Sequence, residues 1–421
     1  MLLCIRGFKY HYLIIKEINF DKCYTGQNMH YQVNKEKRDL RIDFIRGVVM
    51  VILLLVHLEI FSWFNFIVWE RIGLISGAEG FVIVSGYVLG LVHKKINLKT
   101  GFKSSALRLF ERSAQLYKIN LFIVVIIIAL SALPFIDLTV ITTFKNWSNG
   151  QVYELFPNRN EIWYRTIANI LLLRNSPHQI QILGLYCILL LGTPIAIWLF
   201  NQGKAKWVCA ICIIIYFFNM SYPIRITQAQ FEYAFPLLSW QILYIFGLTF
   251  GYFKEEITLK LSSKNYHYIV FFSGLMTFGF MLLAWNSPNN AFPPNVNLGW
   301  IEANTFNDLH YRFFDKSKLG ILRLVNYACF LTFIYWCLTY FWRPIKIIFG
   351  WLLIPLGQAS LYVFIMHLLF IVMVEAITQF SDVKPTFQAS SIWFNTLLHA
   401  SCIFGLWVMV KKKVLFKYVP R

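Results

Sequence analysis

Titratable side chains stand inside a long apolar stretch near the start of the chain, where Arg46 is followed eleven residues later by His57. In an α-helix this spacing returns to within about 20° of the same face and separates the residues by about 16 Å. Ionisable groups are costly in a bilayer, so each is a candidate functional residue. If Arg46 lies at the inner interface, His57 lies near the midplane and can act as a general base. The alternative is a structural histidine bonded to a backbone carbonyl, beside an arginine that reaches the interface.

A second apolar stretch carries Glu79 among small residues that recur every four positions. Such residues let a neighbouring helix approach closely, so we interpret the glycines as packing positions. The carboxylate needs a partner, and His57 is the expected one, because an acid beside an imidazole orients the ring or stabilises its protonated form. Asp43 is expected to pair with Arg46, which also stands where an anion from the cytoplasm would arrive.

Two further groups of residues fit either a structural or a chemical role. Ser360 and His367 are seven residues apart in another apolar run and share a helical face, where a histidine is more often structural than catalytic. Arg108 and Arg112 are four apart in the basic segment 93–118. A helix lying on anionic lipid has this pattern, and a phosphate-binding helix uses the same charges.

The composition points to a membrane protein. Of 421 residues, 58% are hydrophobic and only 14% are charged, too few to cover the surface of a soluble protein of this size. Disordered, coiled-coil, collagen-like and disulfide-scaffold classes are excluded on the same grounds. Because about 20 apolar residues cross the hydrocarbon layer, we predict an all-α polytopic protein with about ten transmembrane helices. The predicted ranges are 42–62, 71–92, 119–136, 180–200, 206–222, 237–253, 266–285, 320–341, 355–378 and 390–410.

Lys and Arg outnumber Asp and Glu by 39 to 20, a formal net charge of +19. The basic residues lie in short clusters, most of which fall on the cytoplasmic side when both termini are placed there. We therefore interpret the charge as topogenic and expect no nucleic-acid partner. Cys209 and Cys212 form one C-x-x-C without a second pair nearby, so no metal site is predicted.

The predicted organisation has three parts. Residues 1–37 form a cytoplasmic extension, 38–411 a single ten-helix membrane domain, and 412–421 a basic cytoplasmic tail. Residues 1–28 mix Lys, His, Tyr and Cys without a clean apolar run and fit poorly with the membrane domain, so Met29 is an alternative start of translation.

Two predicted outer segments, 137–179 and 286–319, are longer than a connection needs. They hold aromatic residues together with basic ones such as Lys316. Aromatic rings with polar neighbours suit a sugar and its hydroxyls, although an interfacial aromatic belt explains each residue equally well.

Ordered blocks of residues from about 38 to 370 resemble those of a known family of membrane proteins. Arg46-x10-His57, followed by Phe81-Val-Ile-Val-Ser85-Gly86, is similar to the acyltransferase-3 superfamily. Within this superfamily the sequence most closely resembles the OpgC-type branch, the periplasmic-glucan succinyltransferases. Its blocks are Arg41 to Gly47, Glu79-Gly80-Phe81, Phe235-Pro236 with Trp240-Gln241, Lys316-Ser317 with Arg323, and Gly357 to His367.

This resemblance implies an integral-membrane O-acyltransferase that moves a succinyl or acetyl group from cytoplasmic acyl-CoA to a hydroxyl of a periplasmic or cell-envelope glycan. His57 would be the base, and Arg46 would hold or gate the donor. The implied catalytic residues are His57, Arg46 and Glu79; the implied donor-binding residues are Arg46, Arg108, Arg112 and Ser85; the implied substrate-binding residues are His367, Asp43, Lys316, Arg323 and Trp240. The branch often has an acidic residue directly before the histidine, where this chain has Val56, so the acyl group and the acceptor stay open.

A secondary transporter or flippase is the alternative, because buried ionisable residues can also form a proton relay. That class favours paired halves of similar pattern, which this sequence does not show. A purely structural membrane protein leaves Glu79 unexplained. For the acyltransferase we expect a multi-pass protein of the inner membrane that contacts lipid, acyl-CoA and glycan, with a homodimer as one possible assembly.

Overall fold

The computed structural model describes residues 30–31, 38–133, 136–145, 151–156, 162–261, 263–378 and 387–420. Within these ranges almost every element is a helix, which confirms the predicted all-α class. Their one sheet is an antiparallel pair of strands, β1 (Thr143–Lys145) and β2 (Val152–Glu154). Most of the predicted N-terminal extension, including Met29, lies outside the described residues.

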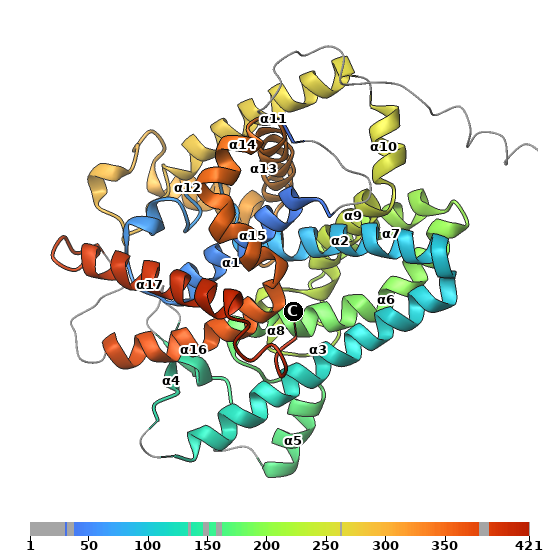
Figure 1. The fold of residues 1–421 in the computed structure, drawn as a ribbon. Helices are drawn as coiled ribbons and strands as arrows, with labels where there is room; N and C mark the ends of the chain where they lie inside the picture. The colour runs from blue at the N-terminus through green and yellow to red at the C-terminus, as the bar shows by residue number, and fades with distance from the viewer. Residues whose placement is uncertain are drawn as a thin grey trace, which may run out of the picture.

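Long helices form a bundle in which α1 packs against five other helices (Figure 1). They are α1 (Leu40–His57), α2 (Gly77–Thr100), α3 (Phe102–Ser131), α6 (Ile182–Asn201), α7 (Ala205–Ser221), α9 (Leu237–Tyr252), α11 (Ser263–Ala284), α13 (Ile321–Tyr340), α16 (Ser360–Thr378) and α17 (Ile392–Lys411). Each overlaps one of the predicted ranges. Seven helices in the described ranges are long and apolar enough to cross a membrane, while α7 and α9 are apolar but shorter. Ten crossings and cytoplasmic termini stay predictions.

Shorter helical elements connect the long ones. The α-helical ones are α4 (Thr139–Thr142), α5 (Trp163–Leu171), α8 (Phe231–Ala234), α10 (Lys254–Lys260), α12 (Ala303–Leu309), α14 (Trp342–Ile345) and α15 (Trp351–Gln358). The single turns of 3₁₀-helix are η2 (Trp63–Phe66), η3 (His178–Ile180) and η4 (Pro294–Val296). Two π-helical turns, η5 (His310–Phe314) and η6 (Lys346–Gly350), complete the set.

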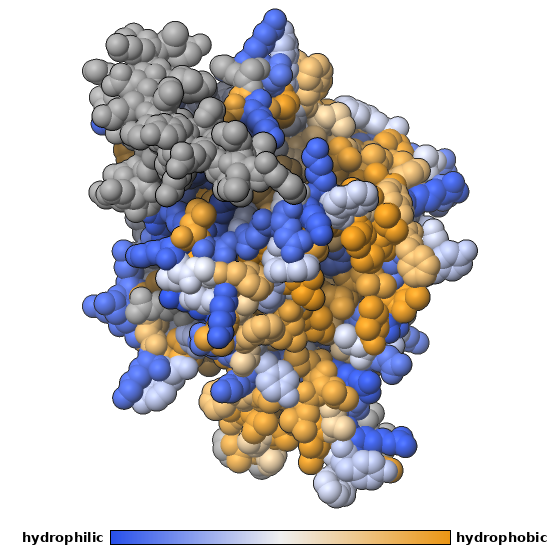
Figure 2. Space-filling model, turned by 90° about the vertical axis from the view of Figure 1, so that its right-hand side faces the viewer, coloured by the Kyte–Doolittle hydropathy of each residue, from blue (hydrophilic) through white to orange (hydrophobic). Residues whose placement is uncertain are grey.

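The outer surface of the bundle suits a lipid environment. Large apolar side chains are exposed along the helices, among them Ile214, Phe271 and Phe404. Figure 2 shows such side chains spread over much of one face of the molecule. In water this much exposed apolar surface would be unfavourable, whereas in a bilayer it faces the acyl chains.

The segment between α1 and α2 has no α-helix, only the 3₁₀ turn η2, so the predicted ends of the first two spans are wrong. α1 ends at His57, and Glu59 follows with a left-handed backbone of φ 51°. α2 begins only at Gly77, where Ser76 and Glu79 form a capping box that stops the helix from extending further back. Residues 58–76 therefore form a connection, and much of it is buried in the bundle.

Two other predicted elements have different bounds. The basic segment 93–118 is not a separate surface helix but the end of α2 and the first half of α3, which meet at Gly101 with φ 84°. The predicted range 355–378 is broken, because α15 ends at Gln358 and α16 begins at Ser360. Broken helices in membrane proteins occur where the freed backbone lines a site or is buried in protein.

Glycines allow the closest helix contacts, which confirms the packing interpretation. A Cβ added at Gly47 of α1 would overlap the carbonyl oxygen of Leu353 in α15, and one at Gly357 would overlap the carbonyl oxygen of Asp43. The same holds between α2 and α9, at Gly86, Gly90, Gly247 and Gly251. These contacts fix how α1 and α2 sit against the rest of the bundle.

Replacing Gly357 by Val should lower the stability of the detergent-solubilised protein by about 1–3 kcal/mol, because α1 and α15 must separate to admit the side chain. The thermal unfolding midpoint measures this. Gly192→Ala is the matched control, since a Cβ there meets nothing within 4 Å. Equal midpoints for the two variants would contradict the packing assignment.

Candidate functional site

His57 and His367 form a pair at the end of α1. Nδ1 of His57 lies 3.0 Å from Nε2 of His367, and the two rings stack with centroids 5.1 Å apart and an interplanar angle of 27°. His367 is fully buried, whereas His57 keeps part of its surface accessible. The sequence placed both residues among candidate site residues, but it did not indicate that they touch.

The hydrogen bonds of this pair fix where its protons lie. Nδ1 of His367 contacts the carbonyl oxygen of Phe364, which can only accept, so this nitrogen carries the hydrogen. Nε2 of His367 is then an acceptor, and Nδ1 of His57 must donate to it. Nε2 of His57 is left with its lone pair free to take a proton from a ligand, as a general base requires.

Glu79 does not pair with His57, so that part of the prediction is wrong. Its carboxylate accepts hydrogen bonds from the backbone and hydroxyl of Ser76 and forms an ion pair with Arg323 of α13. The capping-box geometry aims the side chain back along its own helix, toward α13. A buried carboxylate is stabilised best by a guanidinium, which supplies charge and several donors together.

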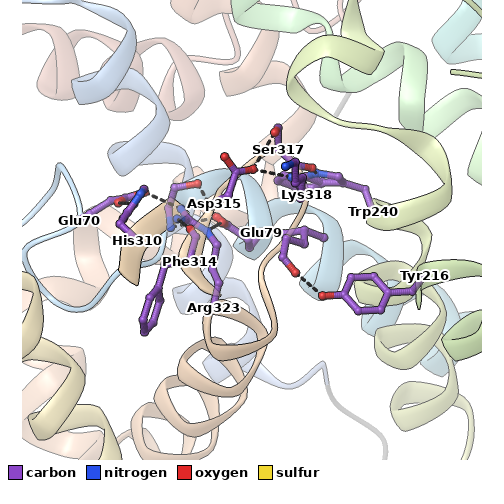
Figure 3. Close-up of polar contacts among 12 residues, drawn as sticks. Glu70, Glu79, Tyr216, Trp240, His310, Phe314, Asp315, Ser317, Lys318 and Arg323 are labelled. Atoms are coloured by element: carbon purple, nitrogen blue, oxygen red, sulfur yellow. Dashed lines mark hydrogen bonds and ion pairs between the residues drawn. The ribbon is translucent and has the colours of Figure 1, made fainter. Parts of the chain in front are cut away.

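Arg323 is the centre of a charge network that ties three elements together (Figure 3). Its guanidinium has no exposed surface and bonds to Glu79, to Glu70 at 2.5 Å and to the carbonyl oxygen of Phe314 at 2.9 Å. His310 lies 3.6 Å from Glu70 on the other side. Burial opposes ionisation of Glu70, but the charge of Arg323 and the hydrogen bonds from His310 and Arg323 outweigh it and lower its pKa to about 2. Arg323 thus holds the connection 58–76 against α2 and α13.

The turn that follows Phe314 is pinned at several points and presents Lys316 to solvent. Asp315 accepts hydrogen bonds from the hydroxyl of Ser317, at 2.7 Å, and from the backbone of Lys318, at 2.8 Å. Trp240 of α9 donates its indole N–H to the carbonyl of Ser317 at 3.1 Å, as Figure 3 shows. Lys316 is exposed and lies within electrostatic range of His57. Trp240 therefore anchors the turn that carries Lys316, and Lys316 is the residue of this turn that lies within electrostatic range of His57.

Arg46, eleven residues before His57 in α1, borders a small cavity whose lining is mostly apolar, with Ser85 and Ser360 as its other polar residues. Its guanidinium donates to the hydroxyl of Ser360, the first residue of α16, and lies 3.7 Å from the carboxylate of Asp43. The cavity holds about 10 Å³, room for about one water molecule. Its lining residues are Arg46, Val49, Met50, Gly80, Phe81, Val84, Ser85 and Ser360. The predicted residues Arg46, Asp43 and Ser85 are therefore gathered where the broken helix restarts.

The two arginines of α3 are placed differently from each other. Arg112 is within electrostatic range of Arg46 and of Tyr186, whose hydroxyl bonds to Ser85. It therefore belongs to the surroundings of the cavity. Arg108 is exposed one turn earlier and lies near His93 of α2 rather than beside the cavity.

Sequence reasoning missed His178, the first residue of η3. Its ring meets that of His57 edge to face, with centroids 6.4 Å apart and an interplanar angle of 87°. Nε2 of His178 lies 3.8 Å from the carboxylate of Glu59. No spacing links residue 178 to residue 57, so the only available signal was its position in the long predicted outer segment 137–179.

Comparison with known proteins gives one match. The profile of the OpgC protein family matches residues 38–417. The chain therefore belongs to this family, as the resemblance of its sequence blocks indicated. No curated protein and no solved structure matches the chain.

Replacing Arg323 by Met should destabilise the protein by about 3–5 kcal/mol, because it leaves the carboxylates of Glu79 and Glu70 without their buried cation. Arg312→Ala is the control: its ion pair with Asp308 is 64% and 57% exposed and should contribute at most about 1 kcal/mol. Unfolding midpoints in detergent compare the two. An unfolding midpoint for Arg323→Met as high as that of Arg312→Ala would contradict the role of Arg323 in holding the connection 58–76 against α2 and α13.

Proposed function

We propose that this OpgC family member is an integral-membrane O-acyltransferase. In this proposal it moves an acyl group from cytoplasmic acyl-CoA to a hydroxyl of a periplasmic glycan. The observation that carries it is the His57–His367 pair, in which Nδ1 of the partly exposed residue His57 is committed to His367 and Nε2 has no hydrogen-bond partner among the described residues. Transfer of an acyl group to an alcohol needs a base that is neutral at rest and holds a proton only briefly.

The donor would enter past Arg46. Arg46 and the first turn of α16, which starts at Ser360, offer positive charge and N–H donors at the cavity. Arg112 adds a second charge near the same place, and Arg108 extends the basic surface along α3. These groups suit the phosphates and the pantetheine amides of a CoA thioester.

In the reaction, Nε2 of His57 takes the proton of the acceptor hydroxyl as its oxygen bonds to the thioester carbon. The C–S bond then breaks, and the proton passes from His57 to the departing thiolate. The base is restored without a net gain or loss of protons. His57 is the last residue of α1 and Arg46 lies eleven residues before it, so in this proposal donor and acceptor would approach from different directions.

Lys316 would select the acyl group. It is an exposed cation near His57, on a turn in which Trp240 bonds to the carbonyl of Ser317 and Asp315 accepts from Ser317 and Lys318. A donor whose acyl chain ends in a carboxylate could pair with it, whereas an acetyl group could not. We therefore propose succinyl-CoA, rather than acetyl-CoA, as the donor.

The same proposal covers the setting of the reaction. Ten crossings with both termini in the cytoplasm would put the acyl-CoA entrance inside and the glycan outside, in the inner membrane. The seven apolar helices support a membrane location, and the clustering of basic residues favours cytoplasmic termini.

His57→Ala should reduce acylation of envelope glucan on the order of 10²–10⁴-fold, because the acceptor hydroxyl loses its base. The assay is mass spectrometry of glucans from cells that express each variant at equal membrane levels. His267→Ala, an exposed histidine on α11, is the control. Full acylation by the His57 variant would refute the mechanism, and acyl-CoA-independent glucan movement in vesicles would favour a flippase.

Lys316→Gln should raise the KM for succinyl-CoA about ten- to hundredfold and leave any acetyl-CoA reaction unchanged. Only the succinyl group ends in a carboxylate, and the substitution removes the cation that would pair with it. Lys318→Gln is the matched control, since its ammonium group packs on the ring of Tyr311. Initial rates with both donors measure the effect. An equal loss with succinyl-CoA and acetyl-CoA would contradict the selectivity role.

A further inference from the structure

Two histidines with different partners face each other at the end of α1. In one pair, His57 is hydrogen-bonded to a second imidazole, His367, at 3.0 Å. In the other, His178 stands 3.8 Å from the carboxylate of Glu59. The rings of His57 and His178 are 6.4 Å apart, against 5.1 Å for the directly bonded His57 and His367.

The two facing histidines have different neighbours. His57 has only neutral partners, an imidazole whose other nitrogen bonds to a backbone carbonyl. His178 lies beside the carboxylate of Glu59, which in turn lies within electrostatic range of Glu375. Two titratable groups whose environments differ in this way are the usual arrangement of a base and an acid at one site.

The free nitrogen of His178 and the backbone of Glu59 both suggest a role beyond packing. With Nε2 turned toward Glu59, Nδ1 of His178 is buried and has no hydrogen-bond partner among the described residues. Buried polar atoms are nearly always paired, so one at a site is expected to meet a ligand or water. Glu59 reaches His178 from a left-handed backbone of φ 51°, a conformation that a non-glycine residue adopts at a cost.

We propose that His178, held by Glu59, is a second catalytic residue that stabilises the negative charge on the carbonyl oxygen during acyl transfer. This inference rests on the proposed function. As the acceptor oxygen bonds to the thioester carbon, its proton moves to Nε2 of His57 and the carbonyl electron pair moves onto oxygen. The imidazolium of His178 donates a hydrogen bond from Nδ1 to that oxygen and keeps its proton. When the C–S bond breaks, the carbonyl re-forms and the thiolate takes the proton from His57.

The test compares three replacements of His178 in the full-length protein, assayed with acyl-CoA and glucan. His178→Phe keeps a ring against His57 but has no donor, and His178→Ala lacks both; each should lower kcat about 10²–10³-fold with the donor KM little changed. His178→Gln retains an amide donor and should keep more activity than the Phe variant. Glu59→Gln should give an intermediate loss, since it removes the charge that holds the imidazolium.

The outcomes separate this inference from the proposed function. If His178→Phe is as active as the unaltered protein while His57→Ala is inactive, His178 only packs, and the inference fails while the acyltransferase stands. A rise in KM without loss of kcat also overturns it. If His57→Ala itself stays active, the proposed function fails. Should the Ala variant not accumulate in membranes, the comparison of Phe with Gln decides.

Discussion

The fully buried guanidinium of Arg323 is the interaction on which the arrangement of the site depends. It joins Glu79 of α2 and Glu70 of the connection 58–76 to α13, and it also bonds to the carbonyl of Phe314. Inside an apolar bundle these carboxylates would be costly without that cation. With it, non-helical backbone can remain buried directly after His57. The histidine therefore faces a polar, protein-lined region at the end of its helix rather than hydrocarbon.

Close helix packing sets the other end of the site. Glycines at 47 and 357 bring α1 against α15, so Arg46 reaches the point where the chain breaks and restarts as α16. Asp43 and Ser360 hold its guanidinium beside the cavity, and Arg112 lies within electrostatic range. Helix α1 thus carries an anion-attracting group, Arg46, eleven residues before a base, His57, at its end. This separation is what a reaction between a cytoplasmic donor and an external acceptor would require.

Apolar run length identified the helices, because each long helix must cover its backbone with about 20 apolar residues. The apolar pattern could not locate the ends of α1 and α2, since the apolar residues of 58–62 and 71–76 continue the pattern of the two helices although they belong to the connection that Arg323 holds. The partner of Glu79 was missed because Arg323 is 244 residues away, and the contact of His57 with His367 spans 310 residues. Glycine spacing predicted close packing but not which helices approach. Spacing along a chain constrains one helix face, whereas these pairs depend on the tertiary fold.

The central claim is that a single imidazole serves reactants held on opposite sides of a membrane. Sealed inside-out vesicles test it, with labelled succinyl-CoA outside, at the cytoplasmic face, and glucan trapped in the lumen. The account predicts labelled glucan in the lumen while the CoA stays outside, and none with His57→Ala. Product that forms only when donor and glucan share one face of the membrane would contradict it.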